Sequence, residues 1–111
     1  MKVELIFEHR CPNADGARAR LRQALVNCGL RSVWTEWQSD DPCSPDYARH
    51  RASPTILVDG RDIAESMAYD GTRACRLYST SNGGVSGMPE LAKIEAALQE
   101  APSDQQQQRQ P

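Results

Sequence analysis

The residues best suited to chemistry in this chain are its cysteines, and one of them occupies a position that favours reactivity. Cys11 opens the run CPNA (residues 11–14), between a strand-like segment at residues 2–8 and a helical pattern over residues 12–28. A thiol at the start of a helix faces unpaired backbone N–H groups and the positive end of the helix dipole, which stabilise a thiolate. Cys11 is therefore predicted to be a nucleophile or a metal-binding thiolate. The structural alternative is a small buried residue at a strand end.

The segments that flank Cys11 predict an α/β domain. Four segments have the apolar pattern of strands: residues 2–8, 31–38, 55–58 and 74–79. Helical spacing or a helix-start signal marks three segments: residues 12–28, a short stretch from Ser44 that ends before Pro54, and the region after Pro89. The resulting order β-α-β-α-β-β-α predicts a four-stranded mixed sheet with helices on both faces.

The composition indicates one small domain with a polar tail. The 111 residues carry a net charge of −2, from 13 Lys and Arg against 15 Asp and Glu, so no positive field is available to hold nucleic acid. No apolar run is long enough to span a membrane, and residues 1–10 do not form a signal sequence. We therefore expect a cytoplasmic protein with reduced thiols and no membrane partner. Residues 1–100 are expected to fold, and residues 101–111 to be disordered.

Over residues 2–100 the chain resembles the thioredoxin-like superfamily. The resemblance rests on CPNA at a strand-to-helix junction and on Ser53-Pro54 opening an apolar strand that ends in Asp59-Gly60. The segments CPNADGARARLRQAL, SPTILVDGRD, CRLYST and GGVSGMPELAKIEAAL are most similar to small bacterial thioredoxin-like proteins, some of them associated with organomercurial lyase. The resemblance implies a thioredoxin-like fold around a monothiol active site.

The same resemblance implies roles for individual residues. Cys11 aligns with the attacking cysteine, and Pro54 aligns with a cis-proline whose preceding backbone, at Ser53, pairs with a bound thiol substrate. A cis bond is accessible at this position because an X–Pro amide has little preference for the trans form. Pro12 and Asn13 are expected to complete the substrate-binding loop. The expected partner is a thiol-containing protein or a small thiol, and no cofactor is expected.

The sequence departs from the family pattern at residue 14. A CxxC motif would place its second cysteine there, but the residue is Ala14, so no neighbouring thiol can release a mixed disulfide. If the first two strands are parallel, Cys43 lies at the same sheet edge as Cys11 and is the best-placed second catalytic thiol, with an unpaired surface cysteine as the alternative. Cys28 falls on the apolar side of the first helix and is interpreted as packing, while Cys75 receives no role.

Three hypotheses follow from this pattern. The first is thiol-disulfide or thiol-transfer chemistry through Cys11, as in a possible oxidoreductase. The second is binding of a soft metal such as mercury or copper by thiolates, as in metal resistance, although no Cys/His spacing matches a zinc or iron–sulfur site. The third is a non-catalytic interaction module on a degenerate thioredoxin scaffold, which would use Trp34 or Trp37 and the loop at residues 61–74.

Overall fold

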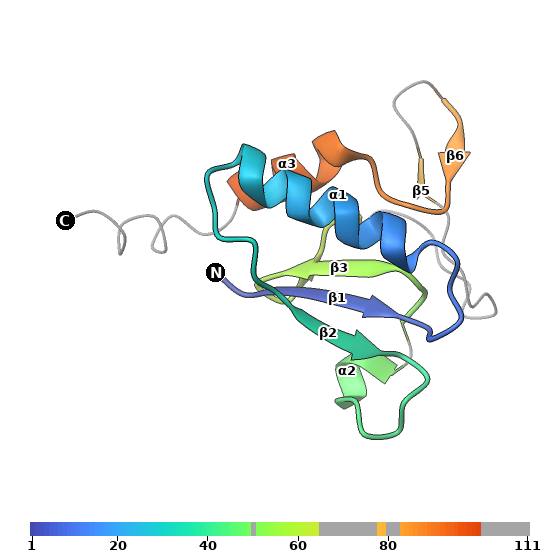
Figure 1. Ribbon diagram of the computed structural model, residues 1–111. Coiled ribbons are helices and arrows are strands. Elements are labelled where there is room, and N and C mark those ends of the chain that lie inside the picture. The colour runs from blue at the N-terminus through green and yellow to red at the C-terminus, as the bar shows by residue number, and fades with distance from the viewer. Residues whose placement is uncertain (50, 65–77, 80–82, 101–111) are drawn as a thin grey trace.

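A four-stranded mixed sheet forms the centre of the protein in the computed structural model, which describes residues 1–49, 51–64, 78–79 and 83–100 (Figure 1). Its strands, in the order β2-β1-β3-β4, are β2 (Thr35–Gln38), β1 (Val3–Phe7), β3 (Thr55–Val58) and β4 (Arg61–Asp62). A separate two-stranded sheet pairs β5 (Tyr78–Ser79) with β6 (Val85–Ser86). The helices are α1 (Ala14–Asn27), α2 (Asp46–Arg49) and α3 (Leu91–Gln99). The predicted α/β class and four-stranded mixed sheet are confirmed.

The strand directions determine where the cysteine-bearing loops emerge. β1 runs parallel to β2 with Phe7 opposite Gln38, and antiparallel to β3 with Ile6 opposite Thr55. Because parallel strands end at the same edge of a sheet, the loops after β1 and β2 leave from one edge. The antiparallel pairing brings the start of β3 to that same edge. Residues 11, 43 and 53 therefore all lie near the end of the sheet at which β1 stops.

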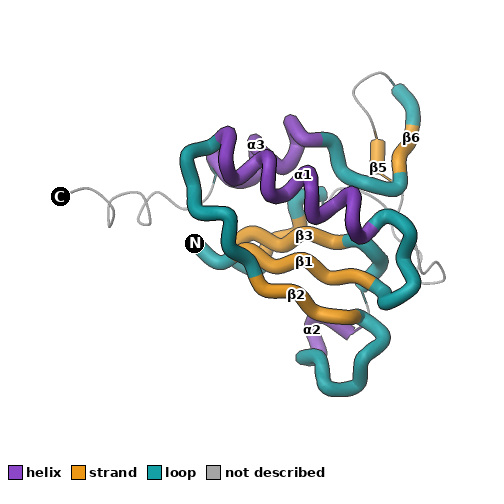
Figure 2. The backbone as a smooth tube through the Cα atoms, viewed as in Figure 1, coloured by secondary structure: helices purple, strands orange, loops and turns teal. Residues whose placement is uncertain are grey.

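Helices cover both faces of the sheet, as the sequence predicts (Figure 2). One face packs α1 and α3 against Val3, Leu5 and Phe7 of β1, together with Ile56 and Val58 of β3. The other face is smaller and packs Ile6 and Leu57 against Ala48 of α2, with half-buried Trp37 beside them. Every residue of the first strand is therefore buried, on both of its sides. Burial of a Leu or Ile side chain contributes about 1.5–3 kcal/mol, so the larger face provides most of the packing stability.

Gly29 ends the first helix, as its position in the sequence indicates. It adopts a left-handed backbone with φ of 73°, which glycine reaches without steric cost. Its N–H donates to the Val26 carbonyl at 3.0 Å, and the Leu30 N–H donates to the Leu25 carbonyl at 2.8 Å. This pair of bonds is a Schellman motif and satisfies carbonyls that would otherwise be orphaned at the helix end.

The predicted fourth strand is wrong in position. The main sheet is completed by Arg61–Asp62, because Asp59 and Gly60 form a two-residue turn with φ of 52° and 83°. A positive φ at both central residues is characteristic of a type I′ turn. Such a turn joins two antiparallel strands directly, so the next strand begins immediately after it. Tyr78–Ser79 pairs with Val85–Ser86 instead, and residues 65–77 lie outside the described part of the chain.

Two other boundaries differ from the expectation. The second strand begins at Thr35 and not at residue 31, and its first residue pairs with Glu4 of β1. The first helix begins at Ala14, after Pro12 and Asn13. The tail at residues 101–111, predicted to be disordered, lies outside the described residues. Within the described residues, no helix is long and apolar enough to cross a membrane.

Candidate functional site

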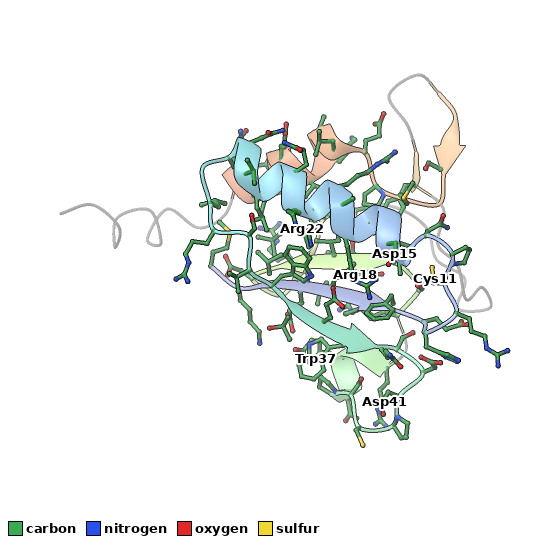
Figure 3. The ribbon with its side chains drawn as sticks, viewed as in Figure 1. Cys11, Asp15, Arg18, Arg22, Trp37 and Asp41 are labelled. Atoms are coloured by element: carbon green, nitrogen blue, oxygen red, sulfur yellow. The ribbon has the colours of Figure 1, made fainter. Side chains whose placement is uncertain are left out.

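Cys11 lies at the start of α1, in the loop that connects this helix to β1 (Figure 3). Its N–H donates to the Glu8 carbonyl at 2.9 Å, and its own carbonyl accepts the N–H of Ala14 at 3.3 Å. The side chain is half-buried and packs against the larger core cluster. The backbone of this loop is therefore fixed on both sides of the sulfur, while part of the residue still reaches the surface.

The two residues after Cys11 have different surroundings. Pro12 is exposed. Asn13 is the N-cap of α1, but its side chain makes no capping hydrogen bond. Instead it lies against Gly87, where an added β-carbon would come within 3.0 Å of the Asn13 amide. The first-turn N–H groups of α1 therefore receive no side-chain cap from Asn13, and they point toward the loop that carries Cys11.

The Ser53-Pro54 peptide bond is cis. Both residues are buried, and the Ser53 Oγ accepts the Glu8 N–H at 2.9 Å. Since the Glu8 carbonyl in turn accepts the Cys11 N–H, two consecutive hydrogen bonds connect the turn at Pro54 to the loop of Cys11. The buried Tyr78 hydroxyl donates to the Pro54 carbonyl and fixes this turn from the other side. The structure thus brings residues 11 and 53 to one place, as the sequence reading expected.

His9 and Arg10 directly precede Cys11 in the chain. Both are exposed, and the His9 ring bonds through Nδ1 to the carboxylate of Asp40, in the loop after β2. The His9 N–H also donates to Asp40 at 3.3 Å. The hydrogen bond from His9 lowers the pKa of Asp40 below its usual value. His9 therefore joins the two loops at this edge of the sheet.

Cys43 emerges at the same edge but has different surroundings. It is exposed, and its N–H donates to the Asp41 carboxylate at 2.8 Å. Cys11 and Cys43 are both free thiols. Figure 3 shows Cys11 beside α1, whereas Asp41, which holds the Cys43 backbone, lies beyond β2 on the side of α2. The structure places the two thiols in adjacent loops and records no bond between them.

Of the other two cysteines, Cys28 lies within the described residues, at the opposite end of α1 from Cys11. Cys28 is half-buried at the end of α1 and packs against the core, as the sequence indicates. Its thiol lies 3.9 Å from the Glu95 carbonyl, and burial, followed by the charge of Glu95, raises the pKa of this thiol. Cys75 lies outside the described residues, as do residues 65–74 of the loop for which a binding role was expected.

An ionic network between α1 and β2 was missed by the sequence reading. The Arg18 guanidinium donates to Glu36 through Nε at 2.8 Å and through Nη2 at 3.1 Å, and it also contacts Asp15 (Figure 3). Its Cζ lies 4.7 Å from the centre of the Phe7 ring. The Trp34 indole N–H donates to the same Glu36 carboxylate at 3.0 Å. Only the Asp15–Arg18 spacing could have been noticed in the sequence, since the rest depends on tertiary packing.

The same network determines the titration of Glu36. Burial alone would raise the pKa of Glu36, but the hydrogen bonds from Arg18 and Trp34 outweigh that effect and lower it. Glu36 therefore stays ionised in moderately acidic solution and keeps the bidentate pair with Arg18, the stronger form of such contacts. The pair attaches the first half of α1 to β2.

A buried carboxylate on the opposite face was also missed. Glu4 of β1 is 2% exposed and accepts the Trp37 indole N–H at 2.9 Å and the Tyr47 hydroxyl. The nearest cation is Lys2, at 3.8 Å. These contacts attach α2 to the sheet, and the hydrogen bond to Glu4 raises the pKa of Tyr47. The strand pattern assigned Glu4 to a polar side, but nothing in the sequence indicated its partners.

The part of the chain that the structure describes holds no group of metal ligands of the usual size. Among the described residues, no set of three or more His, Cys, Asp or Glu side chains could hold a metal ion.

Comparison with protein-family models found no match to this chain, and no curated protein or solved structure matches it.

Proposed function

We propose that this protein is a thioredoxin-like monothiol protein that exchanges thiols and disulfides through Cys11. The observation that carries the proposal is the pair of hydrogen bonds that runs from the Cys11 N–H to the Glu8 carbonyl and from the Glu8 N–H to the Ser53 Oγ. It brings a half-buried thiol at a helix start together with a cis-proline turn. The order β2-β1-β3-β4, with helices on both faces, is compatible with the thioredoxin-like fold and supports the proposal.

The proposed reaction needs two thiols, of which the protein supplies one. The Cys11 thiolate attacks a disulfide of the substrate, one sulfur leaves as a thiolate, and the other remains in a mixed disulfide with Cys11. Ala14 offers no second thiol, and Cys43 is exposed in a different loop. An external thiol then attacks the mixed disulfide, leaves with the substrate sulfur and restores Cys11. The uncapped N–H groups of the first turn of α1 would stabilise the departing Cys11 thiolate.

Pro12 is the residue of the loop best placed to touch a substrate, because it is exposed beside Cys11. Ser53 and Pro54 are buried, so their proposed role is to support the Cys11 loop from the interior of the protein and to form the base of the site. Asn13 packs against Gly87 and supports the same loop from its other side. Substrate contact therefore falls on Cys11 and Pro12, and positioning on the other three residues.

A trapping experiment tests the monothiol mechanism. Incubation of the reduced protein with excess bis(2-hydroxyethyl) disulfide should load Cys11 fastest among the four cysteines, as followed by peptide mass spectrometry. The adduct should persist in the absence of external thiol and disappear when glutathione is added. The matched variant Cys43→Ser should behave like the natural chain. Spontaneous release of the adduct in the natural chain, abolished by Cys43→Ser, would show an internal second thiol and overturn the monothiol mechanism. Loading of Cys11 no faster than Cys43 would overturn the proposed function.

A further inference from the structure

Three consecutive residues before α3 cross the first two turns of α1, next to the Cys11 loop. Gly87 lies against Asn13, Met88 lies against Gly16, and the carbonyl of residue 89 accepts the Arg20 Nη1 at 2.9 Å. Positions 13, 16 and 20 are spaced by three and four residues, so they lie along one side of the helix. We call residues 87–89 the crossing segment. Its last residue, Pro89, is fully buried, whereas Met88 is half-buried.

The thioether of Met88 lies directly on the backbone of the helix. A β-carbon added to Gly16 would come within 3.0 Å of the Met88 Sδ. Glycine is among the least favourable residues in a helix interior, and here its missing side chain leaves the space that the sulfur fills. The middle one of the three contacts between α1 and the crossing segment therefore depends on the size and polarity of one sulfur atom.

We propose that Met88 is an oxidation site that controls how firmly the Cys11 loop is held. The oxidant is a peroxide. The Met88 sulfur attacks one peroxide oxygen, the O–O bond breaks, and a sulfoxide forms with release of water or an alcohol. Met88 is oxidised by two electrons and the peroxide is reduced by two. Met88 is only half-buried, so part of the residue lies at the surface, where a small peroxide can approach it.

Oxidation at this sulfur should be transmitted to Cys11 through two contacts. A sulfoxide is bulkier and polar, so it loses its apolar contact with Gly16 and displaces the crossing segment from α1. Gly87 then withdraws from Asn13, which is two residues from Cys11. The hydrogen bond from Glu8 to Ser53 still holds the Cys11 loop on one side. On the other side, the loop loses the support that the contact between Gly87 and Asn13 provides. The expected result is a more accessible Cys11 thiol.

The experiment measures the alkylation rate of Cys11 before and after oxidation. All thiols are first blocked as methyl disulfides, the protein is treated with hydrogen peroxide, and dithiothreitol then frees the thiols but leaves the methionine sulfoxide. Peptide mass spectrometry measures the sulfoxide at Met88 and the rate at which iodoacetamide reacts with Cys11. Oxidised natural chain should react about threefold faster or more, as expected when a local opening becomes easier.

Met88→Leu is the matched control, because leucine keeps the apolar volume but cannot be oxidised. It retains Met1 and Met67, so an equal increase in treated Met88→Leu would assign the effect to other methionines and overturn the proposal. An unchanged rate in oxidised natural chain would also overturn it. Gly16→Ala, which displaces Met88 without oxidation, should raise the rate in the untreated protein, provided that circular dichroism shows a folded chain.

The inference rests on the proposed function in one respect: a change in the accessibility of Cys11 alters function only if Cys11 is the reacting thiol. Alkylation by iodoacetamide requires a thiol but no exchange activity, so the two ideas can fail separately. A protein that lacks disulfide exchange but shows faster alkylation after oxidation would contradict the proposed function and support the role of Met88. A protein that exchanges disulfides but shows no effect of oxidation would support the proposed function and contradict the role of Met88.

Discussion

Two cysteine-bearing loops leave the same edge of the sheet, and they are held in different ways. Each follows one of the parallel strands β1 and β2, and each places a cysteine next to a proline shortly before a helix. The Cys11 loop is supported by Ser53 and Gly87, which are distant in the chain. The backbone next to Cys43 is held by local contacts, from the Cys43 N–H to Asp41 and from the Ser44 hydroxyl to the Gln38 carbonyl at 2.7 Å, while the start of the same loop is joined to His9 through Asp40.

The difference shows what separates a candidate active thiol from a surface thiol of similar sequence context. Contacts that are distant in the chain form only when the whole domain folds, so they position the Cys11 sulfur relative to β3 and α3. Local contacts shape the Cys43 turn but leave its side chain exposed. Variants that remove support from one loop should therefore change the reactivity of its own cysteine and leave the other cysteine unchanged.

Removal of the Ser53 hydroxyl should have the largest effect. Ser53→Ala leaves the Glu8 N–H without its acceptor in a buried place, which costs about 1–3 kcal/mol of unfolding free energy. Urea denaturation measures this loss, and iodoacetamide should alkylate Cys11 faster while the Cys43 rate stays the same. Ser44→Ala is the matched control, since it removes a hydroxyl from the other loop and should affect only Cys43. Equal changes at both cysteines in either variant would contradict independent support.

Insertion of a methyl group at Gly87 should have the next largest effect. In Gly87→Ala the new β-carbon meets the flexible end of the Asn13 side chain, so we expect a loss of about 1 kcal/mol. The double variant Asn13→Ala/Gly87→Ala removes the collision and should recover most of that loss relative to Asn13→Ala alone. Additive losses in this double-mutant cycle, measured by thermal unfolding, would show that the two residues do not touch.

A smaller effect is expected from the Arg18–Glu36 pair, which supports α1 but touches neither cysteine. Because the folded state lowers the pKa of Glu36, the pair stabilises the protein above the unfolded pKa, and this contribution is lost as the pH falls through the folded value. Glu36→Gln should cost about 0.5 kcal/mol at neutral pH and should reduce the acid-dependent loss below about pH 4.5. Denaturation curves between neutral and acidic pH measure both, and parallel curves for the two proteins would contradict the role of Glu36.

The smallest effect is expected where the two loops meet, at His9 and Asp40. Asp40→Asn removes the carboxylate whose pKa the His9 contact lowers, so the small stabilisation that the natural chain loses in acid should disappear. Since both side chains are largely exposed, the alkylation rates of Cys11 and Cys43 should change little. A large and equal increase at both cysteines would show that this contact, and not the distant supports, holds the two loops.

Much of the fold could be predicted because its signals are local. The alternating apolar residues of β1, the glycine after α1 and the Asp59-Gly60 turn each specify their own structure. The fourth strand was misplaced because β4 has only the polar residues Arg61 and Asp62, and its pairing follows from the geometry of the turn. An apolar pattern therefore could not reveal it, whereas the two-residue turn could have.

The candidate site could be predicted only in part, because strand pairing can be inferred from local patterns but contacts between distant side chains cannot. Cys11 and Ser53 come together because β1 and β3 pair in antiparallel register, which follows from the strand order. The supports from Gly87 to Asn13 and from Arg18 to Glu36 join side chains that are distant in the chain, and no local pattern encodes them. The proposed pairing of Cys11 with Cys43 depends on side-chain directions, which strand topology does not determine.

The central claim is that Cys11 alone carries the chemistry, and the most direct measurement is the rate of disulfide exchange in matched serine variants. The natural chain, Cys11→Ser and Cys43→Ser are compared with glutathione as the reducing thiol and bis(2-hydroxyethyl) disulfide as the substrate. The account predicts that Cys11→Ser falls to the uncatalysed rate while Cys43→Ser keeps the rate of the natural chain. Exchange by Cys11→Ser at the rate of the natural chain would contradict it.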